Sequence, residues 1–244
     1  MAASGNVRYS QIRSGDRQGN GSKVQMFGSG SPTSGNAAVF DANGNIVDFG
    51  SPPGSQGTSL FGISLTPPEL TNFSTWVNQG SASISEVDGG LILIGGSDAS
   101  FNIHARVRTV SIPYTFTMGF IGQLSNATND QFGIVIRQSS DGKMITWGPH
   151  EDDIVRWVSF RMTNATTYGG TTDVNYLLAC HQPMIWLRAA NNSTTRTLEI
   201  STNMGQNWRV IGSQAAGTHL TEDQVGFFVN GADVQCFAVH WSIA

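Results

Sequence analysis

The chain has 244 residues and a formal net charge of −4, and charged residues make up 12% of it, about half the usual share. This weakly acidic balance gives no electrostatic attraction to nucleic acid or to an anionic membrane, so neither is expected as a partner. The sequence has no run of about 18 apolar residues and therefore predicts no membrane-spanning segment. Its opening residues lack the apolar stretch of a secretory signal.

Residues 1–70 differ from the rest in composition and are expected to form an extended, Gly/Ser-rich arm. Residues 37–48 within it have the pattern of a small hairpin, with apolar pairs on either side of Asn43-Gly44. Asp41, Asn43 and Asn45 mimic the start of a calcium loop. The glycine comes too early, however, and Pro52 stands where the closing glutamate belongs, so no metal and no cofactor are predicted.

Two structural states are possible for the arm. It is either a floppy leader or a segment that becomes ordered only on a partner, because scattered apolar residues cannot build a core of their own. The arm is locally basic on an acidic protein, which favours docking onto an acidic neighbour or onto another copy of the chain. The basic residues assigned to this assembly role are Arg8, Arg13, Arg17 and Lys23.

From about Phe73 onward apolar and polar residues alternate, which is typical of strands with one solvent-facing side. Residues 103–109 alternate Ile103, Ala105 and Val107 against His104, Arg106 and Arg108. Near the end of the chain one face is expected to hold Phe237, Val239, Trp241 and Ile243, and the other Cys236, Ala238 and His240. Many short antiparallel strands with recurring aromatic residues predict an all-β fold of two packed sheets over residues 71–244.

The stretch "STNMGQNW" combines small polar residues, a glycine and a tryptophan between two strand patterns. Ser201 and Asn203 can bond backbone amides within a turn, Gly205 can take a positive φ, and Trp208 can fold back over the hairpin. The stretch resembles the Asp-box, a structural hairpin motif, with Asn203 where aspartate normally stands. It is therefore interpreted as a structural turn without a catalytic role.

The residues around this turn resemble concanavalin A-like (LamG/glucanase-type) jelly-roll domains over about 73–244. The matching positions are Trp186, Leu187, Arg188, Leu198, Ser201, Asn203, Gly205 and Trp208, then Val225, Gly226, Phe228, Ala238 and Trp241. The resemblance implies a two-sheet jelly-roll sandwich. Some members of that superfamily are glycoside hydrolases with a Glu-x-Asp-x-x-Glu strand, which this sequence lacks. We therefore expect no enzyme activity, and glycoside hydrolase is the lesser alternative.

The densest polar cluster is "WGPHEDDIVRW", which is interpreted as a loop between strands. A carbohydrate site would use such groups, because sugar C–H faces stack on aromatic rings and carboxylates accept hydrogen bonds from hydroxyls. The predicted carbohydrate-binding residues are Trp147, His150, Asp152, Asp153 and Trp157. Two alternatives stay open: a solvated acidic turn with both tryptophans in the core, and a metal held by His150 with Asp152 or Asp153.

Cys180 and Cys236 are interpreted as two buried thiols, with a disulfide as the alternative. An arm ordered by docking, low lysine content and a concanavalin A-like head together look like phage virion proteins. The resemblance implies a structural protein of the virion, either a tail fibre or a capsid decoration, that is anchored by the arm to other virion proteins. By analogy it would be a homo-oligomer, a trimer, whose head binds host-surface glycans. The main alternative is a free carbohydrate-binding module or lectin.

Overall fold

The computed structural model describes residues 38–40, 46–48, 59–60, 63–96, 101–125, 129–152, 154–177 and 184–244. The chain divides into two units between Ser59 and Leu60. In the first unit, β1 (Ala38–Phe40) and β2 (Ile46–Asp48) pair antiparallel, at the position of the expected hairpin. The short strand β3 (Ser59–Leu60) spans this division, and β4 (Ile63–Ser64) and a 3-10 helix, η3 (Leu70–Phe73), follow it in the second unit.

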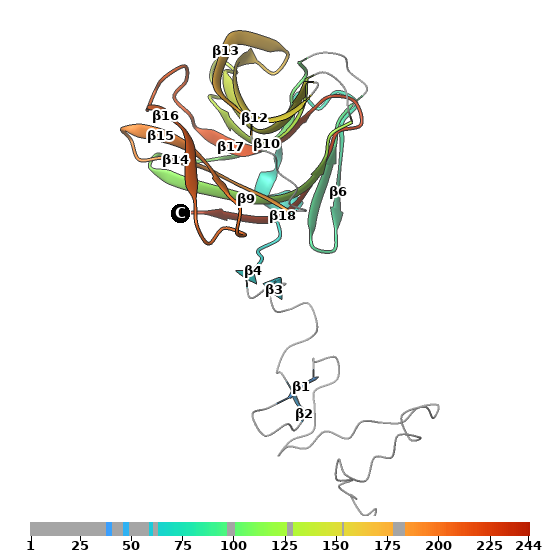
Figure 1. Ribbon diagram of the computed structural model, residues 1–244. Helices are drawn as coiled ribbons and strands as arrows, with labels where there is room; N and C mark the ends of the chain where they lie inside the picture. Colours follow the sequence, from blue (N-terminus) through green and yellow to red (C-terminus); the bar gives the residue numbers. More distant parts are fainter. Residues whose placement is uncertain are drawn as a thin grey trace, which may run out of the picture. The chain divides into compact units, whose positions relative to one another are not determined.

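The described part of the second unit contains two seven-stranded antiparallel sheets (Figure 1). Sheet I has the order β13 (Thr167–Tyr176), β12 (Ile154–Asn164), β11 (Met144–Asp152), β10 (Asp130–Arg137), β17 (Gln224–Asn230), β8 (His104–Thr109) and β5 (Thr75–Val77). Sheet II has the order β16 (Arg209–Ala215), β15 (Thr195–Ser201), β14 (Ile185–Asn191), β9 (Tyr114–Gln123), β18 (Gln235–Ile243), β7 (Gly90–Ile94) and β6 (Ser83–Val87). The all-β sandwich predicted from the alternation is confirmed.

The main core lies between the sheets and is built from the inward positions of alternating strands. On β9, Phe116, Met118 and Phe120 all point inward and are fully buried. They meet aromatic residues of sheet I and of η3, with the Phe73 and Phe227 rings edge to face at 5.2 Å. Each such side chain contributes about 1.5–3 kcal/mol when buried, so a sandwich of this size needs no partner to form its core.

Sheet I is also buried on the face that points away from this core. Val107, Val135 and Phe160 form part of a second apolar cluster there. The cluster is covered because the β12–β13 hairpin bends over it (Figure 1), and the amide of Ile103 donates to the carbonyl of Ala165 at 2.8 Å. The prediction that residues 103–109 have one solvent-facing side is therefore wrong. Arg106 is buried on the side of sheet I that faces the main core, and its guanidinium lies 5.0 Å from the centre of the Trp76 ring.

Strand β18 departs from the expected alternation. Phe237 packs on the outer face of sheet II, whereas Trp241 and Ile243 pack against the main core. The pairing of β18 with β9 has an irregularity between Ala238 and His240. One extra residue in a strand reverses the face of every side chain after it, which is why these residues do not share one face.

The sandwich includes residues that precede the expected boundary at residue 71. Leu65 is buried against Trp186 and Val239 on the outer face of sheet II. The neighbouring Thr66 donates its amide to His240 Nδ1 at 3.0 Å and accepts the amide of Trp241 at 2.9 Å. Leu65 and Thr66 are therefore part of the sandwich, and we call residues 65–69 the strap.

Two further expectations concern thiols and membranes. Cys236 is a fully buried free thiol, and burial raises its pKa well above the usual value. Cys180 lies outside the described residues. No helix in the described part of the chain has the length and apolar character needed to cross a bilayer.

Candidate functional site

The two tryptophans of the predicted carbohydrate site lie in the core. Trp147 has 0% and Trp157 2% of its surface exposed, and their rings pack at 5.9 Å between centroids. The indole N–H of Trp147 donates to the carbonyl of Glu199 in sheet II at 3.3 Å. Neither ring can stack on a ligand from solvent, so this part of the prediction is wrong, and the alternative's placement of both rings in the core is confirmed.

The stretch is also no loop. It consists of the end of β11 and the start of β12, joined at residue 153. Trp147 and His150 are three residues apart on one strand and therefore face opposite sides of the sheet. His150 is buried on the other face, edge to face with Phe160 at 5.0 Å, and its Nδ1 lies 3.1 Å from the carbonyl of Asp130. The Asp152 side chain and Asp153 lie outside the described residues.

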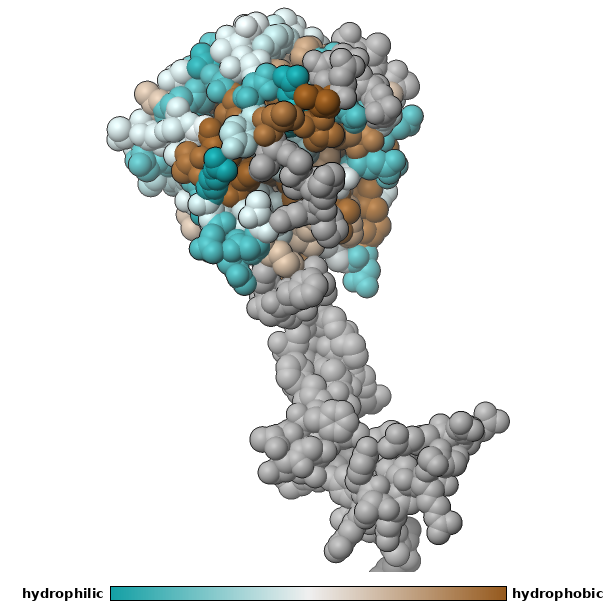
Figure 2. All heavy atoms as spheres, in the orientation of Figure 1, coloured by the Kyte–Doolittle hydropathy of each residue, from teal (hydrophilic) through white to brown (hydrophobic). Residues whose placement is uncertain are grey.

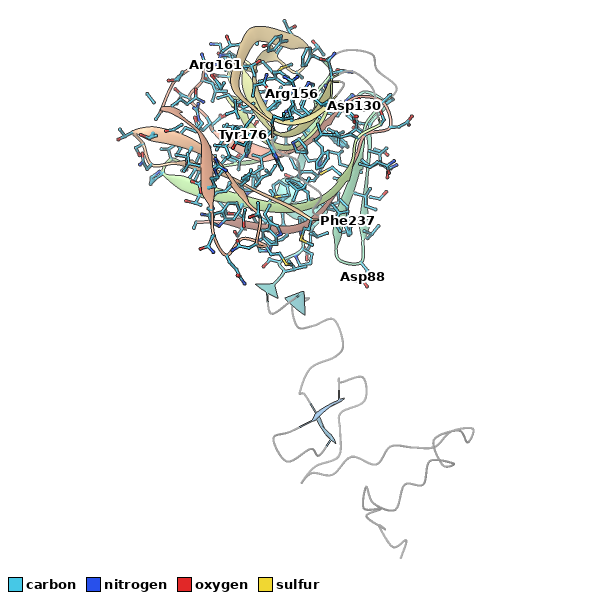
Figure 3. The ribbon with its side chains drawn as sticks, in the orientation of Figure 1. Asp88, Asp130, Arg156, Arg161, Tyr176 and Phe237 are labelled. Carbon is cyan, nitrogen blue, oxygen red and sulfur yellow. The ribbon has the colours of Figure 1, made fainter. Side chains whose placement is uncertain are left out.

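The end of the β11–β12 hairpin instead lies beside a polar rim formed by Arg156, Asn175, Tyr176 and Arg209. Trp157 pairs with Tyr176 across the sheet, which places the end of β13 next to the start of β12. Arg209, at the start of β16 in the other sheet, holds its guanidinium 5.2 Å from the centre of the Tyr176 ring. Its Nη2 also donates to the Tyr176 hydroxyl at 3.1 Å. Figure 3 labels Tyr176 and Arg156 at this end of the sandwich.

Amide and charged groups complete the rim. Arg156 Nη1 lies 3.4 Å from Asn175 Oδ1, a long and weak hydrogen bond that leaves both groups exposed enough to bind something else. Glu151, which pairs with Val155, is half-buried on the same hairpin. Tyr176 pairs with Trp157 and Asn175 with Val158, so Asn175 and Arg156 project from the face of sheet I opposite to Tyr176, whereas Glu151 shares the face of Tyr176.

Apolar side chains are exposed beside these polar groups. Val155 is 41% and Leu177 66% exposed, although both are large and aliphatic. Figure 2 shows hydrophobic residues at the surface of the molecule in this view, bordered by hydrophilic ones. A surface that mixes exposed apolar area with fixed polar groups is typical of a ligand-binding site.

Sequence reasoning missed Tyr176 and Arg209 because they lie 33 residues apart and on different sheets. Their proximity results from β13 facing β16, and no local sequence pattern indicates that these two strands meet. The acidic residues after His150 were the one local signal at this end of the sandwich.

The stretch from Ser201 to Trp208 is a turn whose hydrogen bonds have the expected form. Ser201 Oγ accepts the amide of Gly205 at 2.8 Å, and Asn203 Oδ1 accepts the amide of Asn207 at 2.8 Å. Gly205 has a φ of +83°, and its carbonyl accepts the indole N–H of Trp208 at 2.9 Å. The Trp208 ring is covered by the guanidinium of Arg188 at 3.8 Å, so its main contacts stabilise the hairpin.

Four of the five glutamates have structural partners. Glu69 caps η3, and Glu86 accepts the amide of Leu70 at 3.3 Å. Glu199 lies 3.5 Å from Arg188 Nη1, and Glu222 is buried in contact with Arg196. Among the described side chains, no three His, Cys, Asp or Glu residues gather closely enough to bind a metal ion.

The assembly role predicted for the arm cannot be placed on the structure. Its four basic residues lie outside the described residues, namely Arg8, Arg13, Arg17 and Lys23. That role stays a prediction.

No family model matches the sequence, and no curated protein matches it. Among solved structures, a functionally unknown protein from Saccharomyces cerevisiae is 16% identical with a TM-score of 0.57, over 72% of this chain and 98% of that chain. The GH43 BlXynB protein from Bacillus licheniformis is 17% identical with a TM-score of 0.50, over 63% of this chain and 32% of that one. Bacteroides ovatus Xyloglucan PUL GH43B is 14% identical with a TM-score of 0.50, over 85% of this chain and 46% of that one. This chain spans about a third of one GH43 protein and just under half of the other. At these identities the likenesses show the fold alone, a two-sheet jelly-roll sandwich.

Proposed function

We propose that the protein is a non-catalytic glycan-binding sandwich whose site is the rim around Tyr176. The observation that carries the proposal is a half-buried tyrosine held by Arg209 on the same face of sheet I as the exposed side chain of Val155. The C–H faces of a sugar ring can pack on such a ring, while its hydroxyls exchange hydrogen bonds with Arg209 and with Glu151, which shares this face of sheet I. Two of the structural neighbours are GH43 proteins, and the name of one includes xyloglucan, which suggests a first class of polysaccharide to test.

A binding role without catalysis is favoured by the state of the carboxyl groups. Retaining and inverting glycosidases need two carboxyl groups about 5–9.5 Å apart at an accessible site. Glu69, Glu86, Glu199 and Glu222 already hold backbone amides or arginines of the fold. Only Glu151 of the glutamates belongs to the rim.

The virion role predicted from the sequence gains no support from the neighbours named above. It rests on the composition of residues 1–70 and stays a prediction. Glycan binding by the sandwich would fit that role and a free lectin equally well.

Affinity electrophoresis of the full chain in gels that contain xyloglucan, xylan or mannan tests the proposal. We expect retardation by at least one polysaccharide and a loss of about tenfold or more in affinity for Tyr176→Ala, equivalent to about 1.4 kcal/mol. Tyr168→Ala is the matched control, because Tyr168 is also a half-buried tyrosine of β13 but stacks on Phe101 at the other end of the strand. Unretarded migration in all three gels, or equal losses for the two variants, would contradict the proposal.

A further inference from the structure

Two arginines bridge the seam where the edge strands of the two sheets, β13 and β16, meet. Arg161 of β12 reaches from sheet I to sheet II and donates from Nη2 to the amide oxygen of Gln214 at 3.3 Å. Near the other end of β16, Arg209 reaches from sheet II to sheet I and donates from Nη2 to the Tyr176 hydroxyl at 3.1 Å. The two arginines therefore make the same kind of contact between the sheets.

These two arginines differ in their counterions. Arg161 Nε donates to Asp173 Oδ2 at 2.9 Å, and its Nη2 lies 2.7 Å from Asp173 Oδ1, so a carboxylate of the same sheet neutralises its charge. Arg209 forms no ion pair with any residue that the structure describes. It is also exposed, whereas Arg161 is half-buried. The Tyr176 end of the seam thus carries a positive charge that no described carboxylate compensates.

The guanidinium of Arg209 is held in place despite its exposure. It lies 5.2 Å from the centre of the Tyr176 ring, and one of its N–H groups donates to the hydroxyl of the same tyrosine. Arg209 pairs with the inward residue Ile200, so its side chain projects between the sheets. A guanidinium has five N–H donors, and the others stay available for a ligand. A planar fork fixed in this way is suited to bind a carboxylate through two parallel hydrogen bonds.

Glu151, the rim carboxylate that the structure describes, lies too far away to act as this counterion. Glu151 and Tyr176 share one face of sheet I but are two strands and two residues apart. In a regular sheet this offset separates their Cα atoms by about 12 Å. Opposite charges at the two ends of the rim give a bound glycan a direction: an anionic group is attracted to Arg209 and repelled by Glu151, which accepts hydrogen bonds from hydroxyls instead.

We propose that the rim selects glycans that carry a uronic acid, an inference that rests on the glycan-binding role proposed above. The carboxylate accepts two hydrogen bonds from Arg209, and the sugar ring that bears it packs on Tyr176. A uronic acid has an apolar C–H face and a planar anion on the same ring, which are the two features that this pair of residues recognises. A neutral sugar uses the ring contact without the charge, and a sulfate ester places its charge one bond further from the ring.

Affinity electrophoresis of the full chain compares glucuronoxylan with the same polymer after its carboxyl groups have been reduced to alcohols. We expect the wild type to bind the native polymer about fivefold more tightly, a modest factor because Arg209 is exposed. Arg209→Gln should bind the two polymers equally, and Arg209→Lys, which keeps the charge but not the planar fork, should keep only part of the preference. Arg188→Gln is the matched control and should keep all of it, because Arg188 also lies over an aromatic ring but has Glu199 as its counterion. Far-ultraviolet circular dichroism checks that each variant folds.

The possible outcomes separate this inference from the proposed function. If the wild type binds neither form of glucuronoxylan nor any neutral polysaccharide, both are overturned. If it binds the native and reduced polymers equally, the uronic acid selection alone is overturned. The same holds if both Arg209 variants keep the full preference, or if Arg188→Gln loses it to the same extent as Arg209→Gln. Equally tight, Arg209-dependent binding of a sulfated galactan would show attraction of anions in general and would also overturn it.

Discussion

A buried ion pair between Arg196 of β15 and Glu222, just before β17, makes the sharpest prediction about stability. Both side chains have 0% exposure. Arg196 Nε donates to Glu222 Oε1 at 3.0 Å and Nη2 contacts Oε2, while Nη1 and Nη2 also donate to the carbonyls of Thr218 and Leu220. Glu222 Oε1 accepts Asn191 Nδ2 at 2.6 Å and the Tyr114 hydroxyl at 3.1 Å. One network thus ties β9, β14 and β15 to the segment before β17.

Removing one partner leaves the other charge buried without its counterion. We expect Arg196→Met to lower the free energy of unfolding by about 3–5 kcal/mol, the usual cost of breaking a buried pair. For a body of this size that corresponds to a Tm lower by about 2–4 °C for each kcal/mol. The double variant Arg196→Met/Glu222→Leu should lose less than the sum of its single changes, because no uncompensated charge remains.

Urea unfolding of the four proteins measures these differences. Lys143→Met is the control, since Lys143 forms an exposed pair with Asp141 at 2.9 Å and should lose less than about 1 kcal/mol. A loss below about 1 kcal/mol for Arg196→Met, or a double variant whose loss equals the sum of the single losses, would refute the reasoning.

Acid titration examines the same pair. Burial alone would raise the pKa of Glu222, but hydrogen bonds from Arg196 and Asn191 and the charge of Arg196 outweigh it, so the pKa is lowered. A carboxyl with a lowered pKa stabilises the fold above its unfolded pKa of about 4.3, and this contribution is lost as the pH falls through the folded pKa. The stability gap between the wild type and Glu222→Gln should therefore shrink below pH ~4. A gap that stays constant down to acid unfolding would contradict the assignment.

Three further changes test other parts of the fold. Ser201→Ala removes the acceptor of the Gly205 amide and should cost about 1–3 kcal/mol in urea unfolding, and an unchanged midpoint would contradict the structural role of the turn. Gly205→Ala should lower the Tm by thermal denaturation, because φ is +83° and a Cβ would lie 3.1 Å from the Trp186 ring; a Tm equal to wild type would show that the turn relaxes freely. Burial lowers the pKa of His240, so its neutral form stabilises the fold above pH ~6.5 and this contribution is lost as the pH falls towards the folded pKa. Protonation also removes the acceptor for the Thr66 amide. The Tm should therefore fall less between pH 7.5 and 5.5 in His240→Gln than in the wild type. Equal falls in Tm for the two proteins would rule out the strap contact as the cause of the pH dependence.

The turn and the strands were accessible to sequence reasoning because their signals are local. Ser201, Asn203 and Gly205 lie within five residues, and side-chain hydrogen bonds to neighbouring amides depend on little else. The prediction that Trp147 and Trp157 bind carbohydrate fails for a related reason. Trp147 and Trp157 were grouped with His150 as one loop, but strand pairing made them parts of β11 and β12 and turned both rings into the core.

The alternation of apolar and polar residues by itself determined that the protein is a two-sheet β sandwich, because a period of two fixes which residues share a face of a strand. Alternation could not decide which face meets water. The bent β12–β13 hairpin buries the second face of sheet I, and the irregularity in β18 puts Phe237 and Trp241 on opposite faces. Contacts between distant segments likewise arose only in three dimensions, among them Tyr176 with Arg209. Burial depends on what other segments cover a surface, and that is a property of the packed chain as a whole.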